Sequence, residues 1–453
     1  MKYPKVLLVC SFNQNTANGI TIHNLFKSWP KDRIALVEFN GRIEDIYVPG
    51  INNYYLLGSS EVRFKGLLNR FRKIRPSRAL KINAVSIKNS PKIQKSEYSN
   101  HNGIKTILLK AQRAFLNATG LVMVSRKFYI SKPFEKWLRE YNPDIVYATI
   151  GDICKLDFIH ELKQCYGFRL CVHIFDDYIN SRYQYTLFPE YWMHRLDTAF
   201  RRVIESAELG LAISDKMAAE YSEKYGKTFH VFHNPIDPAI WLADSVRLPM
   251  FSNNQIVTDQ TPQNNPFTFI YAGKVNRDTS KPLKAFIAAI EKLQQAGYNV
   301  RFLIYSPYPS SEIRMQLGNK LENIFQGRAK YTDLPHHFRA ADGLLLPLDF
   351  SLKTIRYIRL SMLTKATEYM ISGTPIFLFT PHGLAVTEYL MKHNAAFHVE
   401  DPATIDAQIL NFMNDAKMRE RISNNALKLA KTHHLQETVG NRLRNLIASL
   451  CSH

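Results

Sequence analysis

The sequence predicts an α/β protein of two doubly wound domains that face each other across a cleft. Its 453 residues, 45% of them hydrophobic, are enough for two cores of roughly 200 residues each. In both halves, short apolar runs typical of buried parallel strands alternate with helical patterns. A polar stretch at residues 244–266 separates the two series, and residues 267–272 start the second one.

The first half opens with a predicted strand at residues 5–10, a polar loop and a helix over about 22–29. A second strand is predicted at 34–39. Asn18 and Gly19 fall in the loop after the first strand, where open α/β sheets bind ligands and a glycine lets a ligand approach the backbone. A simple tight turn is the alternative explanation for this glycine.

A basic segment follows at residues 61–140, with 19 Lys or Arg against four acidic residues, within a chain of net charge +20. Apolar residues recur at helical spacing over residues 63–75, and cations fill most other positions. Such a helix suits an anionic membrane surface, although it could equally pack its apolar stripe on its own domain. The residues expected to bind the membrane are Arg63, Phe64, Lys65, Leu67, Leu68, Arg70, Phe71, Arg72 and Lys73. Residues 81–103 are expected to form a long loop.

Strands are then predicted at 144–149, 170–175 and 209–213, with helices between them. Candidate catalytic groups gather at the end of the middle strand, namely His173, Asp176 and Asp177. A histidine inside a buried strand is more often a core residue than a catalytic one. The two aspartates alternate faces, so only one can point into the cleft, and the pattern leaves open which.

In the second half, Gly273 and Lys274 directly follow the strand predicted at 267–272, and Lys281 precedes a helix expected over about 283–295. Arg277 lies between the two lysines. Cations at a strand end and a helix start suit a diphosphate group. Ordinary solvent-exposed lysines are the alternative for each.

Residues 361–379 combine a helix start, two charges and a helix stop. The helix begins near Thr364 and ends at Gly373, and a strand is predicted at 376–379. Lys365 and Glu368 share one face of the first turns, where free amides and the helix dipole favour an anion. A nucleotide needs cations and amides for its diphosphate and a carboxylate for its ribose hydroxyls. A surface ion pair on an ordinary helix is the alternative.

The order Thr364-Lys365, Glu368-Tyr369-Met370 and Gly373-Thr374-Pro375-Ile376 resembles a signature of GT-B glycosyltransferases, close to glycosyltransferase family 4 (group 1) of the bacterial polysaccharide or lipopolysaccharide type. The resemblance implies two Rossmann-like domains and a glutamate, here Glu368, that holds the nucleotide ribose. It implies a donor site made of Asn18, Gly19, Gly273, Lys274, Arg277, Lys281, Thr364, Lys365 and Glu368. The family's partner glutamate falls on Leu360, which leaves the donor-sugar contact and the stereochemistry open.

The resemblance also implies a domain plan. Residues 1–235 would form an acceptor-side Rossmann-like domain with the basic insertion at 61–140. Residues 236–453 would form the nucleotide-sugar-binding domain, with a terminal helix that packs back on the first domain. His173 and the adjacent aspartates resemble the family's first-domain element near the acceptor and the donor sugar.

We therefore expect a glycosyltransferase of the hexosyltransferase type. It would move a sugar from a nucleotide-sugar donor to a lipid-linked or saccharide acceptor in cell-surface polysaccharide or glycolipid biosynthesis. Enzymes of this fold usually need no metal, so we expect no metal and no cofactor. The alternatives are a nucleotide-sugar epimerase on the same fold and a non-catalytic basic protein that binds nucleic acid or membrane. No RNA-binding signature is present, so we expect no nucleic-acid partner.

No apolar stretch reaches the roughly 18 residues that a membrane span needs. We expect a cytoplasmic protein, peripheral on the inner face of the plasma membrane. The five cysteines lack the C-x2-C spacing of zinc sites and are expected to be reduced.

Overall fold

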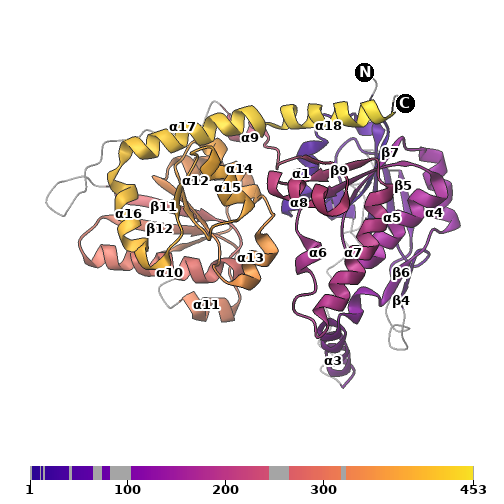
Figure 1. Cartoon of the computed structure of the whole chain (residues 1–453), viewed down its shortest axis with the longest axis horizontal. Coiled ribbons are helices and arrows are strands. Elements are labelled where there is room, and N and C mark those ends of the chain that lie inside the picture. The colour runs from indigo at the N-terminus through magenta and orange to yellow at the C-terminus, as the bar shows by residue number, and fades with distance from the viewer. Residues whose placement is uncertain are drawn as a thin grey trace. The chain divides into compact units, whose positions relative to one another are not determined.

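A computed structural model of the chain describes residues 3–10, 12–13, 16–39, 43–64, 74–81, 104–243, 265–317 and 323–451 (Figure 1). The chain divides into two compact units. Unit 1 consists of Met1–Phe232 and Gly440–His453, and unit 2 of His233–Val439. Each unit is built around its own sheet.

The sheet of unit 1 has the order β10-β9-β8-β7-β1-β2-β3-β5, in which only the β3–β5 pair is antiparallel. The strand at its centre, β1, is buried along its whole length because it pairs with a strand on each side. The strands are β1 (Val6–Val9), β2 (Ile34–Phe39), β3 (Asn53–Leu57), β5 (Arg78–Lys81), β7 (Ile145–Thr149), β8 (Arg169–Ile174), β9 (Leu209–Ala212) and β10 (Phe229–Val231). The doubly wound α/β prediction is confirmed for this unit.

Several helices of unit 1 begin at a serine or aspartate whose side chain accepts a first-turn amide, such as Ser131, Asp152 and Ser214. The helices are α1 (Ala17–Leu25), α2 (Ile43–Ile46), α3 (Ile104–Thr119), α4 (Lys132–Tyr141), α5 (Ile153–Tyr166), α6 (Tyr178–Ser181), α7 (Pro189–Ser206) and α8 (Asp215–Tyr225), with short 3-10 turns η1 (Lys31–Arg33) and η3 (Leu121–Met123). Within the described part of the chain, every helix is too short or too polar to cross a bilayer.

The predicted basic helix over residues 63–75 is wrong at both of its described ends. Arg63 and Phe64 belong to strand β4 (Val62–Phe64), which pairs antiparallel with β6 (Arg126–Phe128). Residues 74–77 have no helical structure. Val62 is buried and Arg63 is exposed, the alternation of a strand, and the guanidinium of Arg63 lies 5.0 Å from the ring centroid of Tyr129. Lys65, Leu67, Leu68, Arg70, Phe71, Arg72 and Lys73 lie outside the described residues.

Asn18 and Gly19 also differ from the prediction, because they lie in the first turn of α1 and not in the preceding loop. The amide of Gly19 donates to the hydroxyl of Thr16, 3.1 Å away. A Cβ at Gly19 would lie 1.9 Å from the carbonyl oxygen of Asn13. The protein's own loop therefore accounts for this glycine, since the backbone of residue 13 occupies the space.

Unit 2 contains an all-parallel sheet in the order β13-β12-β11-β14-β15-β16. Its strands are β11 (Phe267–Ala272), β12 (Val300–Tyr305), β13 (Phe325–Gly327), β14 (Gly343–Pro347), β15 (Ile376–Phe379) and β16 (Phe397–Val399). Phenylalanines from strands and helices, including Phe269, Phe286, Phe377 and Phe412, pack together in its core. The predicted second α/β series is confirmed.

Helices lie on both sides of this sheet, with α10 and α11 on one side and α12, α14 and α15 on the other (Figure 1). They are α9 (Pro238–Trp241), α10 (Arg277–Gln295), α11 (Ser311–Leu317), α12 (Leu334–Arg339), α13 (Leu352–Ile358), α14 (Thr364–Ser372), α15 (Ala385–Lys392), α16 (Ile405–Asn414) and α17 (Ala416–His433), with 3-10 turns η5 (Tyr331–Asp333) and η6 (Pro402–Thr404). Helix α10 starts six residues earlier than predicted, because Asn276 and Thr279 form a capping box.

The last helix, α18 (Gln436–Cys451), begins in unit 2 and belongs to unit 1 from Gly440 onward. In unit 1, Arg444 donates to the hydroxyl of Tyr3, 3.0 Å away. The chain passes from unit 1 into unit 2 after Phe232 and returns at Gly440. In unit 2, the segment that follows the first passage pairs with the segment that precedes the second. The amide of Ile236 donates to the carbonyl of His434 (2.7 Å), and that of Gln436 to the carbonyl of Ile236 (2.8 Å).

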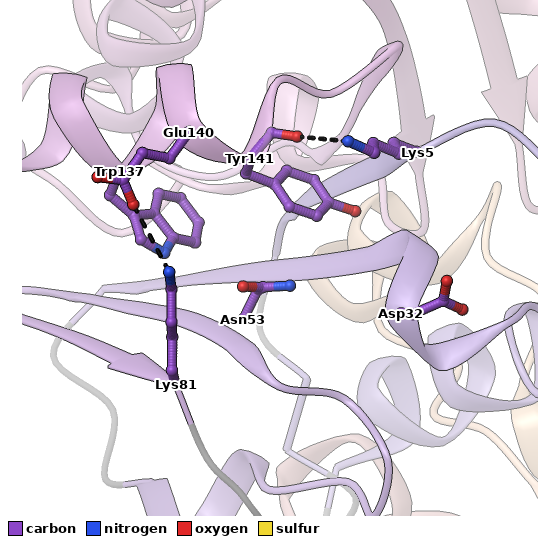
Figure 2. Close-up of a pocket in the computed structure, with 7 residues that line it drawn as sticks. All are labelled: Lys5, Asp32, Asn53, Lys81, Trp137, Glu140 and Tyr141. Atoms are coloured by element: carbon purple, nitrogen blue, oxygen red, sulfur yellow. Dashed lines mark hydrogen bonds and ion pairs between the residues drawn. The ribbon is translucent and has the colours of Figure 1, made fainter.

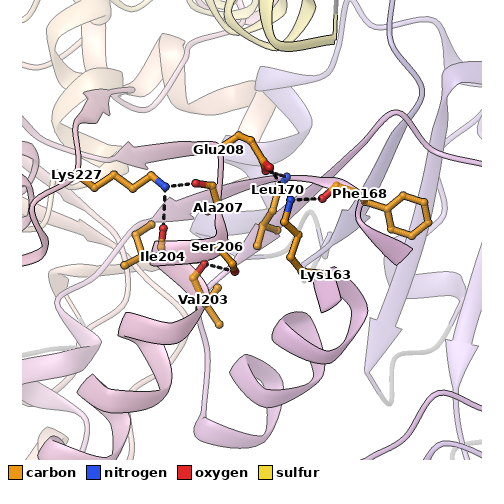
Figure 3. Close-up of polar contacts among 9 residues, drawn as sticks. All are labelled: Lys163, Phe168, Leu170, Val203, Ile204, Ser206, Ala207, Glu208 and Lys227. Atoms are coloured by element: carbon orange, nitrogen blue, oxygen red, sulfur yellow. Dashed lines mark hydrogen bonds and ion pairs between the residues drawn. The ribbon is translucent and has the colours of Figure 1, made fainter. Parts of the chain in front are cut away.

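Two lysines hold the carbonyl groups at helix ends in unit 1 (Figure 3). The ammonium of Lys227 donates to the carbonyl of Ile204, 2.9 Å away, and to that of Ala207, at the end of α7. Lys163, in the last turn of α5, donates to the carbonyl of Phe168 (2.7 Å) and pairs with Glu208 (2.5 Å). A cation suits this position because the last carbonyls of a helix carry the negative end of its dipole.

We predict that Lys227→Met lowers the free energy of unfolding by about 1–3 kcal/mol, because the carbonyl of Ala207 loses the lysine as its donor and that of Ile204 keeps the amide of Ala207 alone of the two donors named. Urea unfolding followed by circular dichroism measures the change. Lys136→Met, at an exposed position of α4, is the matched control and is expected to shift the midpoint little. Equal midpoints for the two variants would contradict the prediction.

Candidate active site

The start of α14 is the best-formed anion site among the predicted positions. Leu363, at the N-cap, has an extended backbone and no capping side chain, so no side-chain cap occupies the amides of Thr364 and Lys365. The amide of Ala366 donates to the carbonyl of Leu363 at 3.0 Å. Thr364 is the first helical residue. The helix ends at Gly373, whose φ of 73° is the left-handed conformation predicted for it.

Lys365 extends from this helix start to the end of β11. Its ammonium donates to the hydroxyl of Tyr271 at 2.9 Å and lies 4.0 Å from the centroid of the same ring. Gly273, at a φ of 150°, passes so close that a Cβ there would lie 2.4 Å from the Lys365 nitrogen. A side chain at this position would force the flexible end of Lys365 to move away from the backbone at the carboxyl end of the strand.

Tyr369, one turn after Lys365, makes a second link between the same two elements. Its buried hydroxyl accepts the amide of Ala272 at 3.1 Å. Tyr271 completes the connection by donating its own hydroxyl to the carbonyl of Lys274, 2.9 Å away. These hydrogen bonds fix the turn after β11 against the start of α14.

Glu368 is half-buried on the same helix, and its partners are residues that no sequence pattern connects with it. Its carboxyl group forms a hydrogen bond with the hydroxyl of Tyr331, which in turn accepts the indole N–H of Trp241 at 3.3 Å. Burial raises the pKa of Glu368 to about 7, although the hydrogen bond from Tyr331 and the charge of Lys365 both lower it. This carboxyl group therefore changes its charge close to neutral pH.

The other residues predicted to bind the donor do not gather at the start of α14. Lys274 is exposed, and Lys281 lies within α10, where its ammonium pairs with Asp349 at 3.7 Å. Arg277 is the first residue of α10, and its side chain lies outside the description. Lys281 therefore has a carboxylate partner of its own, while Gly273, Lys365 and Glu368 share one site.

In unit 1, His173 is fully buried in β8, where Nδ1 lies 2.6 Å from the hydroxyl of Tyr147. Burial lowers the pKa of His173 to about 3, so its imidazole is neutral. Asp177 is also fully buried and accepts hydrogen bonds from Tyr221 (2.8 Å) and Asn180 (2.9 Å). Asp176 is half-exposed, which makes it the more accessible of the two aspartates.

The structure also brings together four charged residues that sequence reasoning missed. Arg126 pairs with Asp152, the N-cap of α5, and the charges of Glu38, Asp152 and Arg126 all act on Lys155. Burial is the largest influence on Lys155 and lowers its pKa. Glu38 lies near the end of β2, and Asp152 follows β7, so the group lies at the carboxyl ends of parallel strands. Glu38 and Arg126 are distant in the sequence from Asp152 and Lys155, and no motif signals the group.

A separate pocket of about 210 Å³ lies at the opposite, amino ends of these strands (Figure 2). It is lined by Lys5, Asp32, Asn53, Lys81, Trp137, Glu140 and Tyr141. The ammonium of Lys5 donates to the carbonyl of Tyr141 (3.1 Å), and Lys81 pairs with Glu140 (3.7 Å). Its cations are thus matched by the protein's own acceptors.

Comparisons with known proteins agree with this geometry. The family model for group 1 glycosyl transferases matches residues 266–415. The sequence has no match among curated proteins.

Solved structures resemble the whole chain. A sucrose-phosphate synthase from Thermosynechococcus elongatus is 13% identical, with a TM-score of 0.57 and coverage of 99% of each chain. HepE from Anabaena, in complex with UDP and glucose, is 14% identical, with a TM-score of 0.57 and coverage of 99% of this chain and 100% of its own. A UDP-forming α,α-trehalose-phosphate synthase from Burkholderia vietnamiensis is 12% identical, with a TM-score of 0.57 and coverage of 98% and 100%.

At these identities the structural likeness establishes the fold, which is GT-B with two Rossmann-like units. The family match covers the strands and helices that carry Gly273, Lys365 and Glu368. Residues 266–415 therefore match the group 1 glycosyl transferase family, and the chain has the GT-B fold.

Proposed function

We propose that the protein is a glycosyltransferase that takes its sugar from a nucleoside diphosphate donor bound at the start of α14. The observation that carries the proposal is the pairing of one cation and one carboxyl group, Lys365 and Glu368, at a helix start without a capping side chain. The amides of this first turn and the Lys365 ammonium supply hydrogen-bond donors and positive charge for the diphosphate. Glu368 supplies acceptors for the two ribose hydroxyls.

The groups around Lys365 and Glu368 prepare both for this role. Tyr271 holds the Lys365 ammonium through its hydroxyl and its ring, so the lysine loses little conformational freedom when an anion arrives. Tyr331 and Trp241 fix the Glu368 carboxyl group from the other side. A bound diphosphate would replace part of the solvent around the Lys365 ammonium with negative charge.

UDP-sugars are the first donors to test. HepE from Anabaena was solved with UDP-glucose, and a similar structure from E. coli was solved with UDP-2-fluoro glucose. Both have TM-scores above 0.5 to this chain, at 0.54 and 0.56. The fold and the Glu368 arrangement are compatible with a uridine nucleotide, and we propose uracil as the base.

On the acceptor side, we propose a lipid-linked or saccharide hydroxyl in cell-surface polysaccharide or glycolipid assembly, reached from an anionic membrane surface. The net charge of +20 and the basic segment at 61–140 support this choice. If the transfer inverts the sugar's configuration, Asp176 is the better placed general base, since Asp177 is buried in hydrogen bonds to Tyr221 and Asn180. If the transfer retains it, the donor's own phosphate can take the acceptor proton.

The donor class can be tested by measuring melting temperatures with UDP-, GDP- and ADP-sugars in turn. A ligand that binds only the folded state raises the melting temperature. We expect the largest rise with a UDP-sugar. A rise with GDP- or ADP-sugars alone would replace the uridine assignment, and no rise with any of them would contradict a donor site in this protein.

Glu368 leads to a pH prediction. Its pKa is raised to about 7, so the carboxylate that accepts the ribose hydroxyls is mostly absent at pH 6 and mostly present at pH 8. If only the ionised form binds, UDP affinity rises by about tenfold over this interval. Calorimetric titration with UDP measures this change in affinity for the parent and for Glu368→Gln. The variant is the control, because protonation of UDP itself affects both proteins equally. Superimposable pH curves would rule out this role for Glu368.

Lys365→Met should weaken UDP binding by about 1.5–3 kcal/mol, the usual cost of losing a charged hydrogen-bond partner. Because the ammonium is assigned to the diphosphate, the loss should be smaller for uridine and UMP than for UDP. Lys284→Met, at an exposed position of α10, is the matched control and should bind UDP as the parent does. An equal loss for uridine and UDP would show that Lys365 is not a diphosphate ligand.

A further inference from the structure

Unit 1 exposes a group of large apolar side chains that neither the sugar-transfer site nor the core explains. Of the ten large hydrophobic residues recorded as exposed in the described part of the chain, six come from two short segments. We call these six residues the apolar tip: Phe115, Leu121, Tyr185, Leu187, Phe188 and Tyr191, with exposed fractions between 40% and 67%. A soluble protein rarely gathers so much apolar surface without a partner.

The two segments of the apolar tip are joined by hydrogen bonds. The amide of Leu187 donates to the carbonyl of Ala118 at 2.7 Å, and the indole N–H of Trp192 donates to the carbonyl of Thr119 at 2.6 Å. Gly120, at a φ of 77°, passes so close to Trp192 that a Cβ there would lie 2.3 Å from the indole nitrogen. The end of α3 is therefore packed onto the start of α7, and Figure 1 shows both at one end of unit 1.

Basic residues accompany the apolar tip. Arg195 donates to the hydroxyl of Tyr191 at 3.4 Å, and its guanidinium lies 5.7 Å from the ring centroid of Trp192. Residues 104–134, which include α3, contain no Asp or Glu, and Glu190 is the only acidic residue of 182–196. The cations of 104–134 are Lys105, Lys110, Arg113, Arg126, Lys127 and Lys132.

We propose that the apolar tip docks this protein onto the surface of an anionic lipid bilayer. Tyrosine, phenylalanine and leucine insert at the boundary between headgroups and acyl chains, and nearby lysines and arginines are attracted to anionic headgroups. The six apolar groups come from a helix end and a neighbouring turn, Arg195 lies beside Tyr191, and the same stretches of sequence are rich in cations, which matches both parts of such a surface. This assignment rests on the proposed transfer to a lipid-linked acceptor, which an enzyme must reach at the membrane.

The test is co-sedimentation with vesicles of phosphatidylglycerol and phosphatidylcholine, compared with phosphatidylcholine alone. The variant with Phe115→Ser, Leu187→Ser and Phe188→Ser removes three exposed groups of the apolar tip. The matched control, Tyr308→Ser with Met315→Ser and Leu352→Ser, removes three groups from unit 2 that are at least as exposed. We expect the parent and the control to bind anionic vesicles, and the first variant to bind on the order of tenfold or more weakly.

Two further measurements separate the possible failures. The melting temperature without nucleotide shows whether each variant is folded, and its rise with UDP tests the proposed donor site independently of vesicles. Absence of parent binding to anionic vesicles, or parent-like binding by the folded tip variant, would overturn the docking proposal even if UDP still binds. A parent dimer in light scattering that the tip variant loses, without vesicle binding, would assign the apolar tip to self-association and would also overturn it.

Discussion

The attachment of α14 to the carboxyl end of β11 is the constraint on which unit 2 depends. Lys365 and Tyr369 lie four residues apart, so they share one face of the helix, and both reach the same strand end. The ammonium of Lys365 donates to the hydroxyl of Tyr271, and the hydroxyl of Tyr369 accepts the amide of Ala272. The helix start is thereby fixed directly above the turn at Gly273, where a larger residue would collide with the lysine.

This attachment also bears on the charges of Lys365 and Glu368, which suit a nucleotide ligand. Lys365 is held by one hydroxyl group and one aromatic ring, neither of which neutralises its charge. Burial of Glu368 raises its pKa to about 7. A nucleoside diphosphate would supply an anion to the first group and hydroxyl donors to the second. Such poised groups are typical of functional sites, where local stability is given up for binding.

The sequence predicted those parts that depend on local pattern. The buried runs that became β1 and β11, and the stop of α14 at Gly373, follow from apolar periodicity and glycine conformation. The helix prediction fails at Arg63 and Phe64 because apolar spacing fits both periods over so few residues, and pairing of β4 with the distant strand β6 decides the outcome. The role of Gly19 was mistaken because its neighbour in space, the carbonyl of Asn13, carries no side-chain signal.

Contacts across long sequence distances were out of reach for the same reason. Nothing in the sequence near Glu368 indicates that Tyr331 and Trp241 will hold it, and no spacing connects Glu38 with Lys155. The apolar tip is a further example, because its two halves are about 70 residues apart and are joined by the hydrogen bonds from Leu187 to Ala118 and from Trp192 to Thr119. Burial and exposure, which only the fold defines, separate these residues from the many others of their type.

The central claim is that the start of α14 receives the diphosphate of a nucleotide sugar, and a crystal structure with UDP tests it most directly. The account predicts phosphate oxygens within hydrogen-bonding distance of the Lys365 ammonium and the first amides of α14, with both ribose hydroxyls on the Glu368 carboxylate. UDP bound at another place in the chain, with this helix start occupied by solvent alone, would contradict it.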